Sequence, residues 1–324
     1  MNERVTAATL PAFEVVANVS EGRDAAILAA YTAVVAGSPG VQLLDVHSDA
    51  DHDRSVFTYA GDAEPLALAT RALARLAIAT IDLTSTEKSG PRRGVHPRIG
   101  AIDVVPFVPL GPSGSEHGAV VAARALGRAL AGDLGLSVHF YGAVARNEAR
   151  RALPDIRRGG FEALTERQRD PRHEPDEGPV APHPTGGAVA VGVRPLMAAW
   201  NISLVEAPEA RLVAAARDIA SSMRGSAPHG IPGLQALGFA LPSIRGAQLS
   251  MNLHNVLQAA TAGVTLHSIR DRARRAAREL GVQLGESEIV GLIPEAALRA
   301  GGDPQDLSIR GGWKQATIES RLTK

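Results

Sequence analysis

The sequence predicts an α+β fold made of two similar halves, each a mixed β-sheet with helices on its outer face. Short runs rich in β-branched residues alternate with longer runs in which apolar residues recur at helical spacing, in the order β-α-β-β-α-β. This order is typical of a split βαβ unit of the ferredoxin-like type. A polar stretch rich in Pro and Gly at 167–187 separates two regions that both alternate in this way.

The first half begins with an expected strand at 13–19 (FEVVANV). Asp24 is a good helix N-cap, and the helix that it starts should run to Gly37 with Ile27 and Tyr31 on its apolar face. The elements expected next are strands at 41–46 and 55–60, a helix at 64–81, a strand at 101–108, a helix at 118–134 and a strand at 137–141.

The second half repeats this kind of pattern beyond the polar stretch. Its expected elements are strands at 188–193 and 199–204, a helix at 208–223, strands at 234–241 and 247–253, a helix at 266–280 and a strand at 288–293. In the helix at 266–280, Ile269 should point inward and Arg270 outward. We therefore expect a first subdomain at 1–177, a connecting loop at 178–187 and a second subdomain at 188–324. If the bare faces of the two sheets oppose each other, the cleft between them is the expected ligand site.

The composition excludes several classes of protein. Lys and Arg together number 34, as do Asp and Glu, so no net charge favours binding to nucleic acid or to an acidic membrane surface. No apolar stretch is long enough to span a membrane, and the N-terminus lacks the pattern of a secretory signal. The absence of Cys excludes disulfides, thiol catalysis and thiolate metal sites. We expect a cytoplasmic protein.

The segment Gly94–Asp103 (GVHPRIGAID) is the first candidate for chemistry. It places His96 and Arg98 around a proline, just before an expected strand. Pro97 favours extended backbone at His96, and an imidazole is suited to proton transfer at neutral pH. The alternative interpretation of His96 is an ordinary loop histidine.

Three further segments each have two interpretations. The loop Asp45–Arg54 (DVHSDADHDR) could hold a metal through His47 and His52, or it could be a solvated polar turn. It lacks HExxH or EF-hand spacing, so we expect no metal. The turn at 18–24 (NVSEGRD) could bind an anion or simply cap a helix, and the basic run 141–158 could be solvated or could meet carboxylates. No GxGxxG, P-loop or GxSxG motif occurs.

Several segments, taken in order, resemble the formiminotransferase domain of glutamate formiminotransferases, which in animals is fused to a cyclodeaminase. The matching segments are NVSEGR (18–23), LLDV (43–46), DRSVFTYAG (53–61), GVHPRIGAIDVVPFVP (94–109), YGAVARNEARRALPDIRRGGFEAL (141–164), PDEGP (175–179), AAWNISL (198–204), SMNL (250–253) and EIVGLIP (288–294). They extend over nearly the whole chain, and the stand-alone microbial form is the expected type.

The resemblance implies a transferase that moves a formimino group from N-formimino-L-glutamate to tetrahydrofolate, a co-substrate, in histidine degradation. It implies two subdomains whose sheets face each other across a ligand tunnel, usually in a homodimer. The family's catalytic histidine corresponds to His96. Its folate-contacting loop corresponds to the connecting loop, with Gly178, Pro179, Val180, Ala181, Pro182, His183, Pro184, Thr185, Gly186 and Gly187.

Roles for the remaining candidate residues follow from the expected reaction. A carboxylate such as Asp45 or Asp103 could stabilise the cationic formimino group, and Arg54 and Arg98 could hold substrate carboxylates. Asn18 and Glu21, in the NVSEGR segment, are further expected substrate-binding residues. With them, the expected site contains residues from four of the matching segments of the first half.

The sequence departs from the family pattern at several of these segments. Ala17 replaces a proline, His47 an acidic residue and Asp53 an asparagine. Val95 replaces an acidic residue, and Gly186 replaces an aromatic residue. They leave two alternatives open: a formyltransferase or a formiminotransferase with a different amino donor, and a non-catalytic folate-binding protein. A metal-dependent hydrolase that uses His47 and His52 is a more distant alternative.

Overall fold

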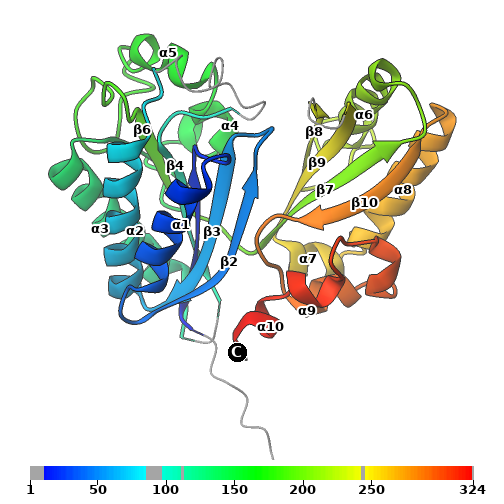
Figure 1. The fold of residues 1–324 in the computed structure, drawn as a ribbon, viewed down its shortest axis with the longest axis horizontal. Coiled ribbons are helices and arrows are strands. Elements are labelled where there is room, and N and C mark those ends of the chain that lie inside the picture. The colour runs from blue at the N-terminus through cyan, green and yellow to red at the C-terminus, as the bar shows by residue number, and fades with distance from the viewer. Residues whose placement is uncertain (1–10, 85–96, 111–112, 242–244, 323–324) are drawn as a thin grey trace, which may run out of the picture. The chain divides into compact units, whose positions relative to one another are not determined.

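The computed structural model describes residues 11–84, 97–110, 113–241 and 245–322, and the chain divides into two compact units at Arg194/Pro195 (Figure 1). No helix within these ranges is long and apolar enough to cross a membrane. Each unit is an α+β unit with one β-sheet and its own hydrophobic core.

The first unit contains a six-stranded sheet in the order β2-β3-β1-β4-β6-β5. Its elements are β1 (Phe13–Val19), α1 (Ala25–Ala36), β2 (Val41–Asp49), β3 (Arg54–Gly61), α2 (Ala63–Thr80), β4 (Ile102–Pro109), α3 (Glu116–Leu134), β5 (Ser137–Gly142), the 3-10 helix η1 (Glu148–Arg150), α4 (Leu153–Ile156), α5 (Gly160–Arg167) and β6 (Ala188–Val193). The pairs β4–β6 and β5–β6 are parallel, and the others are antiparallel.

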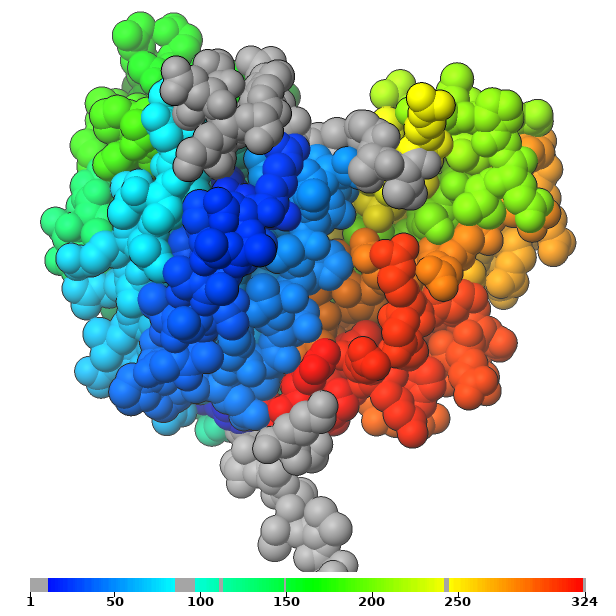
Figure 2. Space-filling view, in the orientation of Figure 1, coloured from blue at the N-terminus to red at the C-terminus, as the bar shows by residue number. Residues whose placement is uncertain are grey.

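Helices α1, α2 and α3 cover one face of this sheet (Figure 1). In β1 the alternate residues Phe13, Val15, Ala17 and Val19 all belong to the core beneath these helices, as the period of two along a strand requires. Asp24 caps α1 as expected, because its Oδ1 accepts hydrogen bonds from the backbone N–H groups of the first helical turn. The space-filling view shows α1 and β2 at the surface of this unit (Figure 2).

The second unit has a four-stranded sheet in the order β10-β7-β9-β8, antiparallel throughout. Its elements are β7 (Met197–Val205), α6 (Glu209–Met223), β8 (Leu234–Leu241), β9 (Gly246–His254), α7 (Val256–Thr261), α8 (Leu266–Glu279), β10 (Gln283–Ile289), α9 (Glu295–Arg299), the 3-10 helices η3 (Pro304–Leu307) and η4 (Trp313–Ala316), and α10 (Ile318–Leu322). Residues of α6 and α8 form one core with the sheet.

Both sheets confirm the split βαβ order in their four-stranded cores. In the first unit β3 lies between β1 and β2, and in the second unit β9 lies between β7 and β8. The prediction of a mixed sheet holds only for the first unit. Parallel pairs arise there because β5 and β6 extend the core, and the second unit has no such extension among its described residues.

Three expectations about the second half differ from the structure. The strand at 188–193, assigned to the second half, is β6 of the first sheet, so the division falls at Arg194/Pro195 instead of after 187. The last strand is β10 at Gln283–Ile289, not 288–293. It is an edge strand with polar residues, and the apolar residues that follow it are buried as an irregular segment. Arg270, expected to point outward, is 5% exposed and donates to the carbonyl oxygen of Gly285 at 3.1 Å.

Candidate active site

On the face of the first sheet opposite α1, α2 and α3, strands β1, β2 and β3 carry several polar side chains, and we call this part of the face the polar face. Over β4, β5 and β6 the same face packs with Ile156 and Leu164 into a smaller apolar cluster. In cross-strand register, Asn18 of β1 lies beside Val56 of β3, which lies beside His47 of β2. Asp45 lies opposite Thr58, after an irregularity in the pairing of β2. Arg54 precedes Val56 by two residues and therefore shares its face. The structure thus brings Asn18, Asp45 and Arg54 onto one surface.

Glu14 is a further carboxyl on the polar face that the sequence analysis did not select. It lies in register with Ala60 of β3 and Val108 of β4, and it is 2% exposed. Burial raises the pKa of Glu14 to about 7, although the charge of Arg194 lowers it. In the sequence, Glu14 is a single polar residue in an apolar strand, and only the alternation of the strand indicates that it lies on the face opposite the core.

The segment 97–103 follows the proposed catalytic histidine, and His96 itself lies outside the described residues, as does Val95. Asp103 is 2% exposed, and its Oδ1 accepts a hydrogen bond from the backbone N–H of Ile99 at 2.8 Å. Its Oδ2 forms an ion pair with Arg157. Both oxygens of Asp103 therefore hold the chain that leads away from His96.

Arg98 is attached to the neighbouring helix α5. Its Nη2 lies 3.8 Å from a carboxylate oxygen of Glu162, and its carbonyl oxygen accepts a hydrogen bond from the N–H of Phe161 at 2.8 Å. The Arg98 side chain is 14% exposed. This geometry fixes the backbone of Arg98 and leaves part of its side chain accessible.

The connecting loop is bonded to the 97–103 segment through main-chain atoms. The N–H of Ala101 donates to the carbonyl oxygen of Gly186 at 2.9 Å, and the N–H of Ala188 donates to that of Ile99 at 2.9 Å. These two bonds join the loop proposed to contact folate to the segment that follows the proposed catalytic residue.

Two glycines allow this close approach. Gly100 and Gly187 form a β-bridge. A Cβ atom at Gly100 would lie 1.9 Å from the carbonyl oxygen of Ala188, and one at Gly187 would lie 2.1 Å from that of Ile99. Gly187 also has a φ of +69°, which disfavours any residue with a side chain.

His183 closes the tight turn at the end of the connecting loop. Its backbone exchanges two hydrogen bonds with Gly187, and its ring Nδ1 accepts a hydrogen bond from the N–H of Gly186 at 2.9 Å. Since Nδ1 is the acceptor, a neutral His183 ring carries its proton on Nε2. Earlier in the loop, Pro179, Val180 and Ala181 are exposed, so their surfaces are accessible to a ligand.

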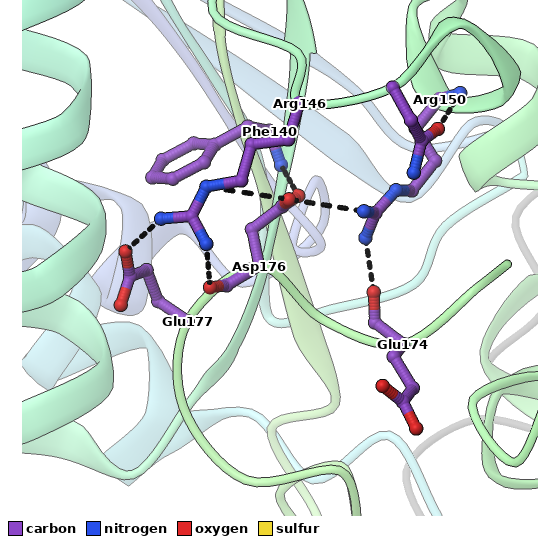
Figure 3. A network of polar contacts seen from close by, with 7 residues as sticks. Phe140, Arg146, Arg150, Glu174, Asp176 and Glu177 are labelled. Atoms are coloured by element: carbon purple, nitrogen blue, oxygen red, sulfur yellow. Dashed lines mark hydrogen bonds and ion pairs between the residues drawn. The ribbon is translucent and has the colours of Figure 1, made fainter. Parts of the chain in front are cut away.

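A network of arginines and carboxylates fixes the chain just before the connecting loop (Figure 3). The Asp176 side chain is 1% exposed; its Oδ2 accepts from the N–H of Phe140 at 2.7 Å, and its Oδ1 lies 3.1 Å from Nη2 of Arg150. Arg146 pairs with Glu177 and donates to the carbonyl oxygen of Asp176 at 2.7 Å. Burial raises the pKa of Asp176, while its hydrogen bond and the two arginines oppose this shift. The arginines Arg146 and Arg150 of the basic run 141–158 therefore meet carboxylates, one of its two predicted interpretations.

The turn at 18–24 uses its polar groups internally. Oε1 of Glu21 accepts hydrogen bonds from the N–H groups of Arg23 and Asp24 at 2.8 and 2.9 Å. Ser20 donates its hydroxyl to the carbonyl oxygen of Gly100 at 2.7 Å. The turn therefore forms a capped helix start, one of its two predicted interpretations, and Ser20 connects this turn to the 97–103 segment.

The loop between β2 and β3 is a polar turn. Oδ1 of Asp49 accepts from the N–H of His52 at 2.8 Å, and Oδ1 of Asp53 accepts from the N–H of Gly22 at 3.2 Å. Asp53 also lies 3.5 Å from Nη1 of Arg23. Over the part of the chain that the structure describes, no group of three or more His, Asp or Glu side chains could hold a metal ion.

Comparison with known proteins extends the observations on both units. Residues 12–194 match the model of the N-terminal subdomain of the formiminotransferase domain, and residues 199–303 match that of the formiminotransferase domain. The first match ends at the division between the two units. The chain belongs to the formiminotransferase family.

Relatives with two kinds of name are similar to this formiminotransferase chain. The formimidoyltransferase-cyclodeaminase of Sus scrofa is 37% identical over 88% of this chain, and the glutamate formimidoyltransferases of Streptococcus pyogenes and Thermoplasma acidophilum are each 34% identical over 88%. The chain spans 50% of the animal protein but 90% and 89% of the two microbial ones.

The formiminotransferase site residues predicted from the sequence fall into two groups in the structure. One group surrounds the 97–103 segment and includes Arg98, Asp103 and the end of the connecting loop. The other group lies on the polar face and includes Asn18, Asp45 and Arg54. The segment from Asn18 to Ser20 joins the two groups, since Ser20 bonds to Gly100.

Proposed function

We propose that the protein transfers the formimino group of N-formimino-L-glutamate to N5 of tetrahydrofolate, giving 5-formiminotetrahydrofolate and L-glutamate. Family membership and the names of the two microbial relatives support this proposal. The observation that carries it is the main-chain bonding between the connecting loop and residues 99–101. This contact joins the loop proposed to bind folate to the segment that follows His96.

The proposed reaction is an addition followed by an elimination. N5 of tetrahydrofolate attacks the formimino carbon, and His96 accepts the proton that N5 loses. The same histidine then gives this proton to the nitrogen of glutamate as the bond between that nitrogen and the formimino carbon breaks. General acid–base catalysis of this kind is worth about a hundred- to ten-thousand-fold in rate.

The other predicted residues have roles in binding. Asp45 lies on the polar face, and its proposed role is to stabilise the cationic formimino group through its carboxylate. Arg54 and Arg98 are the proposed partners of substrate carboxylates, because guanidinium groups bind them through paired hydrogen bonds. Asn18 in β1 and Glu21 in the turn that follows it stay the further proposed substrate contacts. A tunnel between facing sheets and a homodimer stay predictions from the family resemblance.

The proposed reaction is tested by incubating purified protein with N-formiminoglutamate and tetrahydrofolate. The product, 5-formiminotetrahydrofolate, is cyclised by acid to methenyltetrahydrofolate and followed by absorbance. We expect the wild type to form this product and the His96→Ala variant to lose at least about a hundredfold in kcat. Tetrahydrofolate binding, measured by calorimetry, should persist in the variant. An unchanged kcat in His96→Ala would refute the role of His96.

A different one-carbon donor is the second candidate. His47 replaces an acidic residue of the family pattern, and it lies in the cross-strand row of Asn18 on the polar face. A change from an acidic to an imidazole side chain there alters the charge offered to a cationic donor. Comparing N-formylglutamate and N-formiminoglutamate as donors distinguishes the two candidates, since faster transfer from the formyl compound would favour the second.

A further inference from the structure

Three segments of the second half that match the family meet in one cross-strand row of the second sheet. Strands β10, β7 and β9 lie side by side (Figure 1). Glu288 of β10 lies opposite Asn201 of β7, and Asn201 lies opposite Ser250 of β9. The three residues come from the segments EIVGLIP, AAWNISL and SMNL. The candidate site of the first unit gives none of these segments a role.

The row lies on the face of the sheet opposite α6 and α8. The residues that flank Asn201 and Ser250 in their strands belong to the core that these helices share with the sheet, namely Trp200, Ile202, Leu249 and Met251. Since side chains alternate along a strand, Asn201 and Ser250 point to the other face. Gln248 lies two residues before Ser250 in β9 and therefore shares this face.

The amide of Gln248 has a donor group that is bonded and an acceptor that is not. Its Nε2 donates to Oε1 of Glu288 at 3.3 Å, and Nδ2 of Asn201 donates to the same oxygen at 3.2 Å. Asn201 and Gln248 are 4% and 6% exposed. Oε1 of Gln248 is buried and has no hydrogen-bond partner among the described residues. Because a buried acceptor without a donor is costly, this oxygen points to a ligand that donates a hydrogen bond.

The charges around the row favour a ligand without carboxylates. Arg310 is shared between two carboxylates, since its Nη1 lies 3.8 Å from Oε2 of Glu288 and its Nε donates to Oε2 of Glu286 at 3.3 Å. One guanidinium balances only one of these two negative charges. The cluster of Glu286, Glu288 and Arg310 is therefore negative overall, and it repels an anion but attracts N–H groups.

We propose that Gln248, Asn201, Ser250 and Glu288 form a subsite for the aminopyrimidine edge of the pteridine of tetrahydrofolate. The inference rests on the proposed function and concerns residues of the second unit alone. This edge carries the N3–H and 2-amino donors and no negative charge, and Oε1 of Gln248 accepts a hydrogen bond from the 2-amino group. The other substrate, N-formiminoglutamate, carries two carboxylates, which the negative cluster disfavours.

The test measures the binding of tetrahydrofolate by calorimetry, without the amino-acid donor. Gln248→Met keeps the length of the side chain and removes the amide, and we expect Kd to rise about tenfold. KM for N-formiminoglutamate should change less than about twofold. The matched control is Gln283→Met, because Gln283 is an exposed amide of β10 that also donates to a carboxylate, that of Glu206. This control should leave Kd unchanged.

An analogue of tetrahydrofolate with a methyl group in place of the 2-amino group identifies the bonded atom. The wild type should bind this analogue about tenfold more weakly than tetrahydrofolate, and Gln248→Met should bind the two with Kd values within about twofold of each other. Equal discrimination by the wild type and Gln248→Met would overturn the proposal, since the 2-amino group would then have another partner.

A milder variant keeps the test valid if Gln248→Met fails to fold, which thermal unfolding shows. Ser250→Ala removes only the hydroxyl of a half-buried residue in the same row, and it should raise Kd for tetrahydrofolate about threefold. An unchanged Kd in every folded variant of the row would refute the subsite.

Failure of the proposed function is distinguishable from failure of the subsite. A wild type that binds tetrahydrofolate more tightly than its variants but transfers no formimino group would support the subsite without the reaction. Formimino transfer with equal Kd in the wild type and the variants would support the reaction without the subsite. A wild type that does not bind tetrahydrofolate would refute both.

Discussion

The core β4-β1-β3-β2 of the first unit and the sheet β10-β7-β9-β8 of the second unit have the same strand order, and both are antiparallel. Their faces opposite the helices differ in chemistry. The polar face of the first sheet carries Glu14, Asp45 and Arg54. In the second sheet, Asn201 and Gln248 donate hydrogen bonds to the carboxylate of Glu288 at 3.2 and 3.3 Å.

The difference between the two faces shows that the strand order of a sheet does not determine where ionisable groups are buried. A single strand order supports a face with Glu14, Asp45 and Arg54 in one unit and a face with Asn201, Gln248 and Glu288 in the other, because alternate strand positions can be changed without affecting the core. Glu14, whose pKa burial raises to about 7, lies on the polar face of the first sheet beside the proposed substrate-binding residues. A buried carboxyl with a shifted pKa in that place supports our proposal that the chemistry belongs to the first sheet.

The test with the largest expected effect replaces one carboxylate by its amide in the corresponding strand of each core. Asp103 of β4 and its partner Arg157 have side chains that are 3% and 11% exposed. Asp103→Asn leaves the guanidinium without its counter-charge and should lower the free energy of unfolding by about 3 to 5 kcal/mol. Glu288→Gln in β10 is the matched control and should cost less than about 1 kcal/mol, because two amides and the exposed Arg310, 3.8 Å away, contact this carboxylate. Urea denaturation measures both, and equal losses would contradict the comparison.

A second test measures how the buried carboxyl of Glu14 makes the free energy of unfolding depend on pH. Its pKa rises from 4.5 to about 7 on folding, so between these values the folded state binds more protons than the unfolded state. Stability should therefore fall as pH rises from 4.5 to 7, by up to about 3 kcal/mol. Glu14→Gln should remove this slope, which urea midpoints at several pH values measure. Parallel pH curves for the wild type and the variant would show that Glu14 ionises normally.

The smallest effects concern two glycines of the first unit. Gly192→Ala would force a methyl group against the Tyr141 ring, and we expect a loss of about 1 to 3 kcal/mol. Gly132→Ala is the control, because this exposed position in α3 has no neighbouring atom within 4 Å of a Cβ. That change should stabilise the protein by about 0.5 to 1 kcal/mol. Thermal unfolding measures both, and a stable Gly192→Ala variant would mean that Tyr141 moves freely.

The sequence was sufficient to predict β1 to β5 and α1 to α3 of the first unit because their apolar periodicity is regular, but it did not predict the short helices α4 and α5. It failed at β10, where the polar residues of an edge strand do not form an apolar pattern, and at Arg270, whose charge suggested exposure. The assignment of 188–193 to the second half was wrong because pairing partners distant in the chain leave no local signal. A strand cannot be assigned to a sheet from its own residues.

The sequence predicted which segments of the chain form the candidate site, but it did not predict the contacts between their residues. The matching segments placed 97–103 and the connecting loop in one site, and the structure shows them bonded. Arg157 was not singled out, because the sequence indicated only that the basic run 141–158 could meet carboxylates and not which ones. Its partner Asp103 lies 54 residues away in the chain, and no local pattern signals such a contact.

The main-chain bonds of the connecting loop also affect how its sequence can change. Carbonyl oxygens and N–H groups hold the loop to residues 99–101, and the glycines at 100 and 187 permit the approach. Apart from His183, whose ring accepts a hydrogen bond from Gly186, the side chains between 179 and 185 are therefore not needed to anchor the loop. Natural selection can replace them one at a time on a constant backbone, so related enzymes can diverge in ligand preference while the loop keeps its place.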